Sequence, residues 1–173
     1  FDVYIKGLDD LLEAFVDFQK KYNSKKIILV FIGGHSLKKP YNSEVYFNNI
    51  RNKLIFPKNF IVKGPFYGKR KWSELSKLDI LIQPSRTEGM PNSILEALSM
   101  AIPCCISEET NMKDIILNSK SGWIIKRDRK NIYNFFCKVS GFKKTKMIEK
   151  GLRGKKYVDK NYNWEKISQP NYY

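Results

Sequence analysis

Histidine and cysteine are scarce in this chain of 173 residues, which has one histidine, His35, and the cysteines Cys104, Cys105 and Cys137. A single histidine leaves no basis for a zinc site or a Ser-His-Asp triad within the chain. The cysteines are odd in number and lack metal-ligand spacing, and neighbours on a strand point to opposite faces. We therefore expect reduced thiols, in or near the core of a cytoplasmic protein.

Long apolar runs and acidic side chains are also in short supply. The longest apolar run, residues 27–32, is far too short to cross a bilayer. Lysine and arginine number 32 against 17 acidic residues, so the net charge is +15. Such a charge favours an anionic partner, which would be a nucleotide, a membrane surface or a nucleic acid. Lysine outnumbers arginine 26 to 6, so a bias of the coding sequence remains an equal explanation.

Several functional motifs are missing as well. No GxGxxG follows the first predicted strand, which disfavours a Rossmann dehydrogenase. A nucleic-acid-binding module would explain the charge, yet the chain has neither a known binding motif nor a cluster of aromatic side chains. The basic runs at 126–130 and 143–160 fit a solvated helix face as well as a membrane-surface patch.

Helix-like and strand-like patterns alternate along the rest of the sequence. The first helix carries an apolar stripe from Leu8 to Phe18. Helices are expected over residues 6–22, 42–54, 71–79, 91–101 and 111–117 and in the last fifty residues; strands are expected over 26–34, 60–64, 80–85, 103–107 and 122–126. This alternation predicts an α/β fold, a Rossmann-like doubly wound parallel sheet with right-handed crossovers.

Ligands of such sheets bind at the carboxyl ends of the strands, which here carry the loops IGGHS, KGPFYG, PSRTEGMPN and SEETN. We draw residues 1–173 as one domain, in which 161–173 form a tail that packs toward another domain. The chain begins at Phe1 and enters a patterned segment at once, so we expect it to be part of a longer protein.

The segment EGMPNSILEA, residues 88–97, has the features of an anion site. The free N–H groups and the dipole of a helix that begins near Pro91 favour a phosphate, and Gly89 permits close approach of the backbone. Glu88 and Glu96 would repel a phosphate but can accept hydrogen bonds from hydroxyl groups on either side of it. A nucleotide sugar has both a diphosphate and sugar hydroxyl groups on either side of it. The alternative is that Glu88 caps the helix and Glu96 is an exposed surface residue.

The segment EGMPNSILEAL resembles the Glu-x7-Glu signature of retaining glycosyltransferases of family 4, which have the GT-B fold. YIKGLDDLLEAF, ILVFIGG, IVKGPF, TNMKDII, SGWII and YNWEKI follow the family's order as well. The resemblance covers nearly the whole chain and implies the C-terminal, donor-binding half of such an enzyme. It implies transfer of a hexosyl unit from a nucleotide diphosphate sugar to a glycan or lipid-linked acceptor, which the N-terminal half would bind, in cell-surface polysaccharide biosynthesis.

The resemblance also implies roles for individual residues. Glu88 would contact the donor hexose, Glu96 the ribose hydroxyls, and Lys6 the diphosphate, so that Glu88 and Lys6 are the catalytic candidates. The remaining donor-binding candidates are Gly33, Gly34, Gly64, Pro65, Phe66, Gly89, Met90, Pro91, Asn92 and Ser93. For Lys6, the glycine pair and the Gly64–Phe66 segment, ordinary solvated or turn positions remain open as alternatives. The family's arginine upstream of the lysine has no counterpart in this chain.

Further expectations concern cofactors, partners and location. No DxD motif is present, so we expect no metal and no cofactor besides the donor substrate, and no nucleic-acid partner. Lipid-linked acceptors imply a cytoplasmic protein with possible peripheral contact at the anionic inner face of the membrane. A nucleotide-sugar 2-epimerase of the same superfamily is the alternative enzyme.

Overall fold

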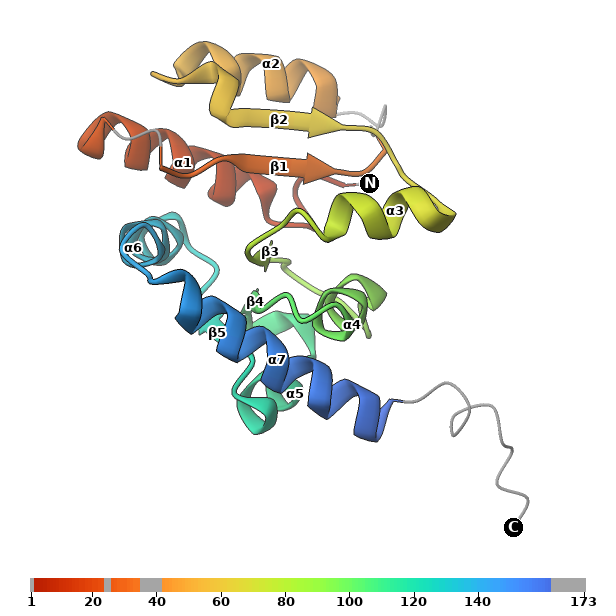
Figure 1. Cartoon of the computed structure of the whole chain (residues 1–173). Helices are drawn as coiled ribbons and strands as arrows, with labels where there is room; N and C mark the ends of the chain where they lie inside the picture. Colours follow the sequence, from red (N-terminus) through yellow and green to blue (C-terminus); the bar gives the residue numbers. More distant parts are fainter. Residues whose placement is uncertain (1, 24–25, 35–41, 163–173) are drawn as a thin grey trace.

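Helices and strands alternate in the computed structural model, which describes residues 2–23, 26–34 and 42–162 (Figure 1). The helices are α1 (Leu8–Tyr22), α2 (Ser43–Lys53), α3 (Gly68–Leu75), α4 (Asn92–Ser99), α5 (Lys113–Ser119), α6 (Arg129–Val139) and α7 (Lys144–Asn161). The strands are β1 (Leu29–Ile32), β2 (Phe60–Lys63), β3 (Leu81–Gln83), β4 (Cys104–Ser107) and β5 (Gly122–Ile125). Two short 3-10 helices, η1 (Pro57–Asn59) and η2 (Glu108–Thr110), complete the set.

The first helix shows why the element order could be predicted. Its stripe from Leu8 to Phe18 is buried as expected, because side chains three or four residues apart share one face of a helix. The helix ends at Tyr22 and is followed by its C-cap residue, Asn23, whose φ of 43° is left-handed. The structure corrects α3, which starts three residues earlier than predicted and ends at Leu75.

All strand pairs are parallel, which confirms the predicted α/β class, but the described strands form two ladders rather than one. One ladder joins β1 to β2, and the other has the order β3-β4-β5. Figure 1 shows the first ladder with α2 in the upper part of the molecule and the second in the lower part. The interruption lies between β1 and β3, both of which line the same cavity.

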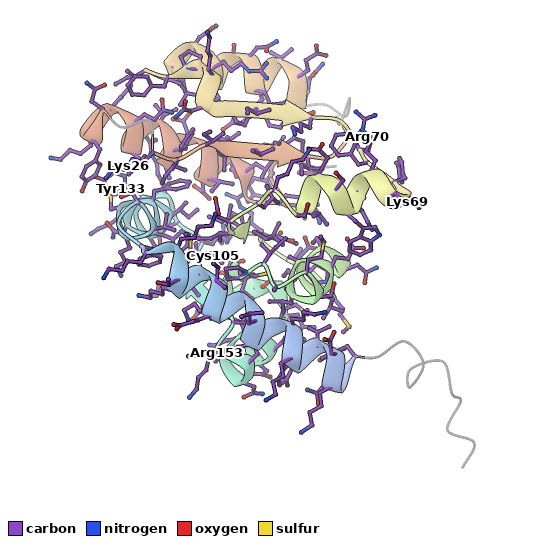
Figure 2. All side chains as sticks on the ribbon, viewed as in Figure 1. Lys26, Lys69, Arg70, Cys105, Tyr133 and Arg153 are labelled. Carbon is purple, nitrogen blue, oxygen red and sulfur yellow. The ribbon has the colours of Figure 1, made fainter. Side chains whose placement is uncertain are left out.

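Two hydrophobic clusters support these ladders. The first gathers side chains of α1, α2, α6, β1 and β2, with Phe15 and Phe18 of α1 both packed against the ring of Phe136. The second lies among α4, α5, α7 and the β3-β4-β5 ladder. Cys104 and Cys105 are fully buried on β4, and Figure 2 shows Cys105 in the interior. All three cysteines are free thiols that form no disulfide within the described residues.

The long helix α7 lies close to the turn between α4 and β4. A Cβ atom placed on Gly151 would come within 1.8 Å of the carbonyl oxygen of Ala101. Only a residue without a side chain permits this approach. Arg153 on the same helix is labelled in Figure 2, on the outer side of the molecule. The predicted tail after Tyr162 and the histidine His35 lie outside the described residues.

Candidate functional site

The segment that leads into α1 is tied to the loop that follows β3. The backbone N–H of Arg86 donates to the carbonyl of Ile5 at 2.8 Å. Gly7 lies so close to Pro84 that an added Cβ would come within 1.9 Å of the Pro84 carbonyl oxygen, and its φ is 63°. These contacts place Lys6 at the carboxyl end of β3.

A salt bridge network holds the two segments together. The Nη1 and Nη2 atoms of Arg86 donate to the two carboxylate oxygens of Asp9 at 2.5 and 2.9 Å, and Nη2 also donates to Asp10 at 2.7 Å. Nη1 donates in addition to the carbonyl of Tyr4, and the guanidinium lies 3.9 Å from the centre of the Tyr4 ring. Burial by itself would lower the pKa of Arg86, but the hydrogen bond and charge of Asp9 raise it above its usual value.

Glu88 is the acceptor of three side-chain donors. Lys6 Nζ donates to its Oε1 atom at 2.5 Å, Ser85 Oγ at 2.9 Å and Gln83 Nε2 at 3.1 Å. All three bonds end on Oε1, so Oε2 has no protein donor within the described residues. Burial alone would raise the pKa of Glu88, but the hydrogen bonds from Lys6 and Ser85 lower it below its usual range, and the carboxylate is held ionised.

The start of α4 presents unsatisfied backbone donors. No side chain caps this helix, whose N-cap residue is Pro91. In the described part of the chain, the N–H groups of Gly89, Met90, Asn92 and Ser93 have no protein acceptor. Ser93 Oγ donates to Gln83 Oε1 at 2.7 Å, which connects this turn to the Glu88 network. Such a turn can bind an anion through its N–H groups and the helix dipole.

Glu96, one turn into α4, accepts a hydrogen bond from Lys71 Nζ at 2.7 Å. Lys71 closes a run of three basic residues, Lys69 to Lys71, in the first turn of α3. Positive charges are unfavourable at a helix N-terminus because they oppose the helix dipole. Lys71 is the member of the run that lines the cavity, and Figure 2 shows Lys69 and Arg70 on α3 at the outer edge of the molecule.

A cavity of about 360 Å³ joins several of the predicted residues. The polar residues of its lining are Lys6, Lys71, Gln83, Ser93 and Glu96, and most of the other lining residues are apolar. The predicted residues that line this cavity are Lys6, Gly33, Pro65, Phe66, Ser93 and Glu96. The predicted residues outside its lining are Gly34, Gly64, Glu88, Gly89, Met90, Pro91 and Asn92, of which Glu88 is joined to it through Lys6.

Sequence reasoning missed four residues of this site: Gln83, Ser85, Arg86 and Lys71. Gln83 and Ser85 lie two residues apart at the carboxyl end of β3, so the alternation of side chains along a strand could have placed them together. Nothing in the local pattern signals Lys71 or the partners of Arg86, because those contacts join separate elements.

Two further properties bear on cofactors and membranes. Within residues 2–23, 26–34 and 42–162, no group of three or more histidine, cysteine or acidic side chains is placed to hold a metal ion. None of the helices in the same ranges is both long and apolar enough to span a bilayer.

Residues 3–135 match the model of the family described as glycosyl transferases group 1. The UDP-Gal:alpha-D-GlcNAc-diphosphoundecaprenol alpha-1,3-galactosyltransferase of Escherichia coli is 32% identical over 82 residues, which are 47% of this chain and 21% of that protein. The match thus spans about a fifth of that curated relative's length.

Solved structures share the fold. Anabaena HepE in complex with UDP-glucose superimposes with a TM-score of 0.80 and 12% identity, over 98% of this chain and 44% of that one. The C-terminal domain of LpcC, a glycosyl transferase group 1 family protein from Francisella tularensis, superimposes with a TM-score of 0.72 and 20% identity, over 92% of this chain and 81% of that one. Because the family model covers more than half of the chain, the chain belongs to the glycosyl transferases group 1 family, with the Rossmann-like fold of a GT-B C-terminal domain.

Proposed function

We propose that this chain is the donor-binding domain of a retaining family 4 glycosyltransferase, which moves a hexosyl unit from a nucleotide diphosphate sugar. One observation carries the proposal. Lys6 and the unsatisfied N–H groups at the start of α4 lie at the same strand ends as two carboxylates, Glu88 and Glu96. A diphosphate would bind to Lys6 and the N–H groups. The hydroxyl groups on either side of the diphosphate would donate to the two carboxylates.

The diphosphate would bind at the start of α4. Cleavage of the bond between sugar and phosphate places negative charge on the leaving diphosphate. Lys6 and the N–H groups of Gly89, Met90, Asn92 and Ser93 would stabilise that charge, as preorganised donors do when they lower a barrier. The proposed reaction needs no metal for this step.

Glu88 would hold the donor hexose. Its Oε1 atom is occupied by three protein donors, which fix the carboxylate in one orientation. Its Oε2 atom is left for a sugar hydroxyl. A role in positioning the hexose does not require Glu88 to act as a nucleophile, and the two-carboxylate scheme of glycoside hydrolases does not apply.

Glu96 would accept hydrogen bonds from the ribose hydroxyls. Without ligand its charge is balanced by Lys71. A bound diphosphate would attract Lys71 in turn, because Lys71 lines the same cavity in which the phosphates would bind. Lys71 is therefore expected to contact both the ribose-binding carboxylate and the donor's charge.

The names of similar proteins support the substrate class. The name of the E. coli relative specifies a UDP-galactose donor and a lipid-diphosphate acceptor, and HepE was solved with UDP-glucose. We infer a glycan or lipid-linked acceptor for the present protein, bound by a separate N-terminal domain, with residues 161–173 packing toward it. The net charge of +15 fits a cytoplasmic protein in contact with the anionic inner face of a membrane.

Calorimetric titration tests donor binding. A few charge-assisted contacts, set against the cost of association, leave about −4 to −7 kcal/mol for nucleotide binding to this chain alone, and no transfer. The chain is titrated with UDP, GDP and ADP and with their hexose conjugates. The absence of a binding heat for every nucleotide, measured on a folded sample, would contradict the proposal.

Substitution of Glu96 tests its proposed role in binding the ribose. Glu96→Gln is expected to weaken nucleotide binding about ten-fold, whereas Glu149→Gln on the exposed side of α7 serves as the matched control and leaves it unchanged. Equal affinities for Glu96→Gln and the parent chain would remove the ribose role. Product analysis with the full-length protein separates retaining transfer from inversion and from epimerisation, through the anomeric configuration of the product.

A further inference from the structure

Gln83 is a polar side chain among largely apolar neighbours. It is the last residue of β3, it follows Leu81 and Ile82, and it lines the cavity, most of whose lining residues are apolar. An amide in such surroundings is costly unless its hydrogen bonds are made. A glutamine side chain offers two N–H donors and one carbonyl acceptor. The bonds that Gln83 makes can therefore be compared with the bonds that it could make.

Two protein partners fix the orientation of the Gln83 amide. Its Nε2 atom donates to Glu88 Oε1 at 3.1 Å, and its Oε1 atom accepts from Ser93 Oγ at 2.7 Å. An ionised carboxylate can only accept hydrogen bonds, so the nitrogen of the amide must face Glu88 and the oxygen must face Ser93. One N–H of Nε2 is used in this arrangement. The second N–H has no acceptor within the residues that the structure describes.

Glu88 has a matching free acceptor. Its Oε1 atom takes all three protein donors, and Oε2 takes none within the described ranges. The two oxygens of a carboxylate are about 2.2 Å apart. Gln83 Nε2 therefore lies no more than about 5 Å from Glu88 Oε2. Hydrogen bonds to oxygen are about 2.7–3.0 Å long, so one ligand atom can bond to both.

A free donor beside a free acceptor selects the chemistry of the ligand group. The group must accept from Gln83 and donate to Glu88 at the same time. A hydroxyl does both. A phosphate oxygen cannot donate, and the charge of Glu88 repels it; an ammonium group cannot accept. Water can occupy the position before the ligand binds, and a sugar hydroxyl reproduces its two hydrogen bonds.

We propose that Gln83 is a specificity-determining residue for the donor sugar, which donates a hydrogen bond to the same hexose hydroxyl that donates to Glu88. The inference rests on the proposed role of Glu88 in holding the hexose. It adds that the two side chains act as a pair and that the pair recognises one particular hydroxyl. A hexose that lacks this hydroxyl would leave both groups without a partner, which is why such sites discriminate.

A scan of deoxy sugars tests the pair. The chain is titrated, with detection by NMR, with UDP-glucose and UDP-galactose and with their 2-, 3-, 4- and 6-deoxy analogues. We expect one deoxy analogue to bind the parent chain at least about ten-fold more weakly than the complete sugar nucleotide. In Gln83→Met, which is apolar and similar in length, the same deletion should weaken binding by about three-fold or less.

Each variant is compared with itself, so a general weakening of nucleotide binding cancels. A merely structural role of Gln83 would change the affinities for all analogues by one factor and leave their ratios unchanged. Asn49→Met, at an exposed position of α2, is the matched control and should discriminate like the parent. Gln83→Leu is the second variant if Gln83→Met does not fold, as judged by thermal unfolding.

The outcomes separate this inference from the donor-binding role. Binding of the sugar nucleotides with the same discrimination in Gln83→Met as in the parent would overturn the role of Gln83 alone. Equal affinities of the parent for every deoxy analogue would do the same. Absence of binding for every sugar nucleotide, in a folded sample, would overturn the donor-binding role and this inference together.

Discussion

Arg86 and Asp9, which are 77 residues apart in the sequence, form a two-point ion pair with contacts of 2.5 and 2.9 Å. The pair joins the loop before α4 to the first turn of α1. Each of these segments carries one catalytic candidate, Glu88 in the loop and Lys6 just before the helix. The ion pair therefore supports the placement of the two candidates, which also contact each other directly, without touching either of them.

Replacing Arg86 should destabilise the domain. Arg86→Ala removes a largely buried cation and leaves Asp9 and Asp10 facing each other, so we expect a loss of about 2–4 kcal/mol in the free energy of unfolding. Arg86→Lys should lose most of the same amount, because one ammonium group cannot reproduce the paired contacts. Urea unfolding measures both changes. A loss below about 0.5 kcal/mol for Arg86→Ala would show that the pair contributes nothing.

Gly7 should tolerate no side chain. An alanine there would place Cβ within 1.9 Å of the Pro84 carbonyl oxygen and would require a left-handed φ. We expect Gly7→Ala to cost about 2 kcal/mol or more in the free energy of unfolding. Gly34→Ala is the matched control, since no atom of the described residues lies within 4 Å of its added Cβ. Equal thermal unfolding midpoints for the two variants would contradict the close approach.

The pKa of Glu88 predicts a pH dependence. Because hydrogen bonds lower the pKa of the folded state, the ionised carboxylate stabilises the fold above the unfolded pKa of about 4.3, and this stabilisation is lost as the pH falls through the folded pKa. Glu88→Gln should therefore be less stable than the parent by about 1–2 kcal/mol at pH 7, and the difference should shrink as the pH falls through the folded pKa of Glu88. Denaturant unfolding between pH 3 and 7 gives the two curves, with Glu149→Gln as the control. A difference that does not change with pH would argue against an ionised Glu88.

The three cysteines should differ in reactivity. Burial raises the pKa of the Cys104 and Cys105 thiols, and both are fully inaccessible in the fold. Cys137 is only half-buried. A chromogenic disulfide reagent should therefore modify Cys137 first and the other two only after unfolding. Cys137→Ser should abolish the fast phase, and a fast phase that survives this substitution would contradict the buried position of β4.

The order of elements could be predicted because it depends on local patterns. The stripe of α1 and the β-branched run of β1 require no knowledge of their neighbours. The side-chain contacts of the site could not be predicted. Lys6 and Glu88, for example, are separated in the sequence by three strands and three α-helices. The gap between the ladders could not be seen either, since a pattern indicates that a strand forms but not which strand lies beside it.

Gly151 on α7 has a consequence for how the protein's charge can vary. The helix comes close to the Ala101 carbonyl at a position that carries no side chain, whereas the exposed Arg153 on the same helix lies on the outer side of the molecule. The close approach to Ala101 and the exposed charge of Arg153 thus belong to different positions of one helix. Exchanging the exposed Arg153 for another residue changes the surface charge of the helix, while the close approach of Gly151 to Ala101 stays the same.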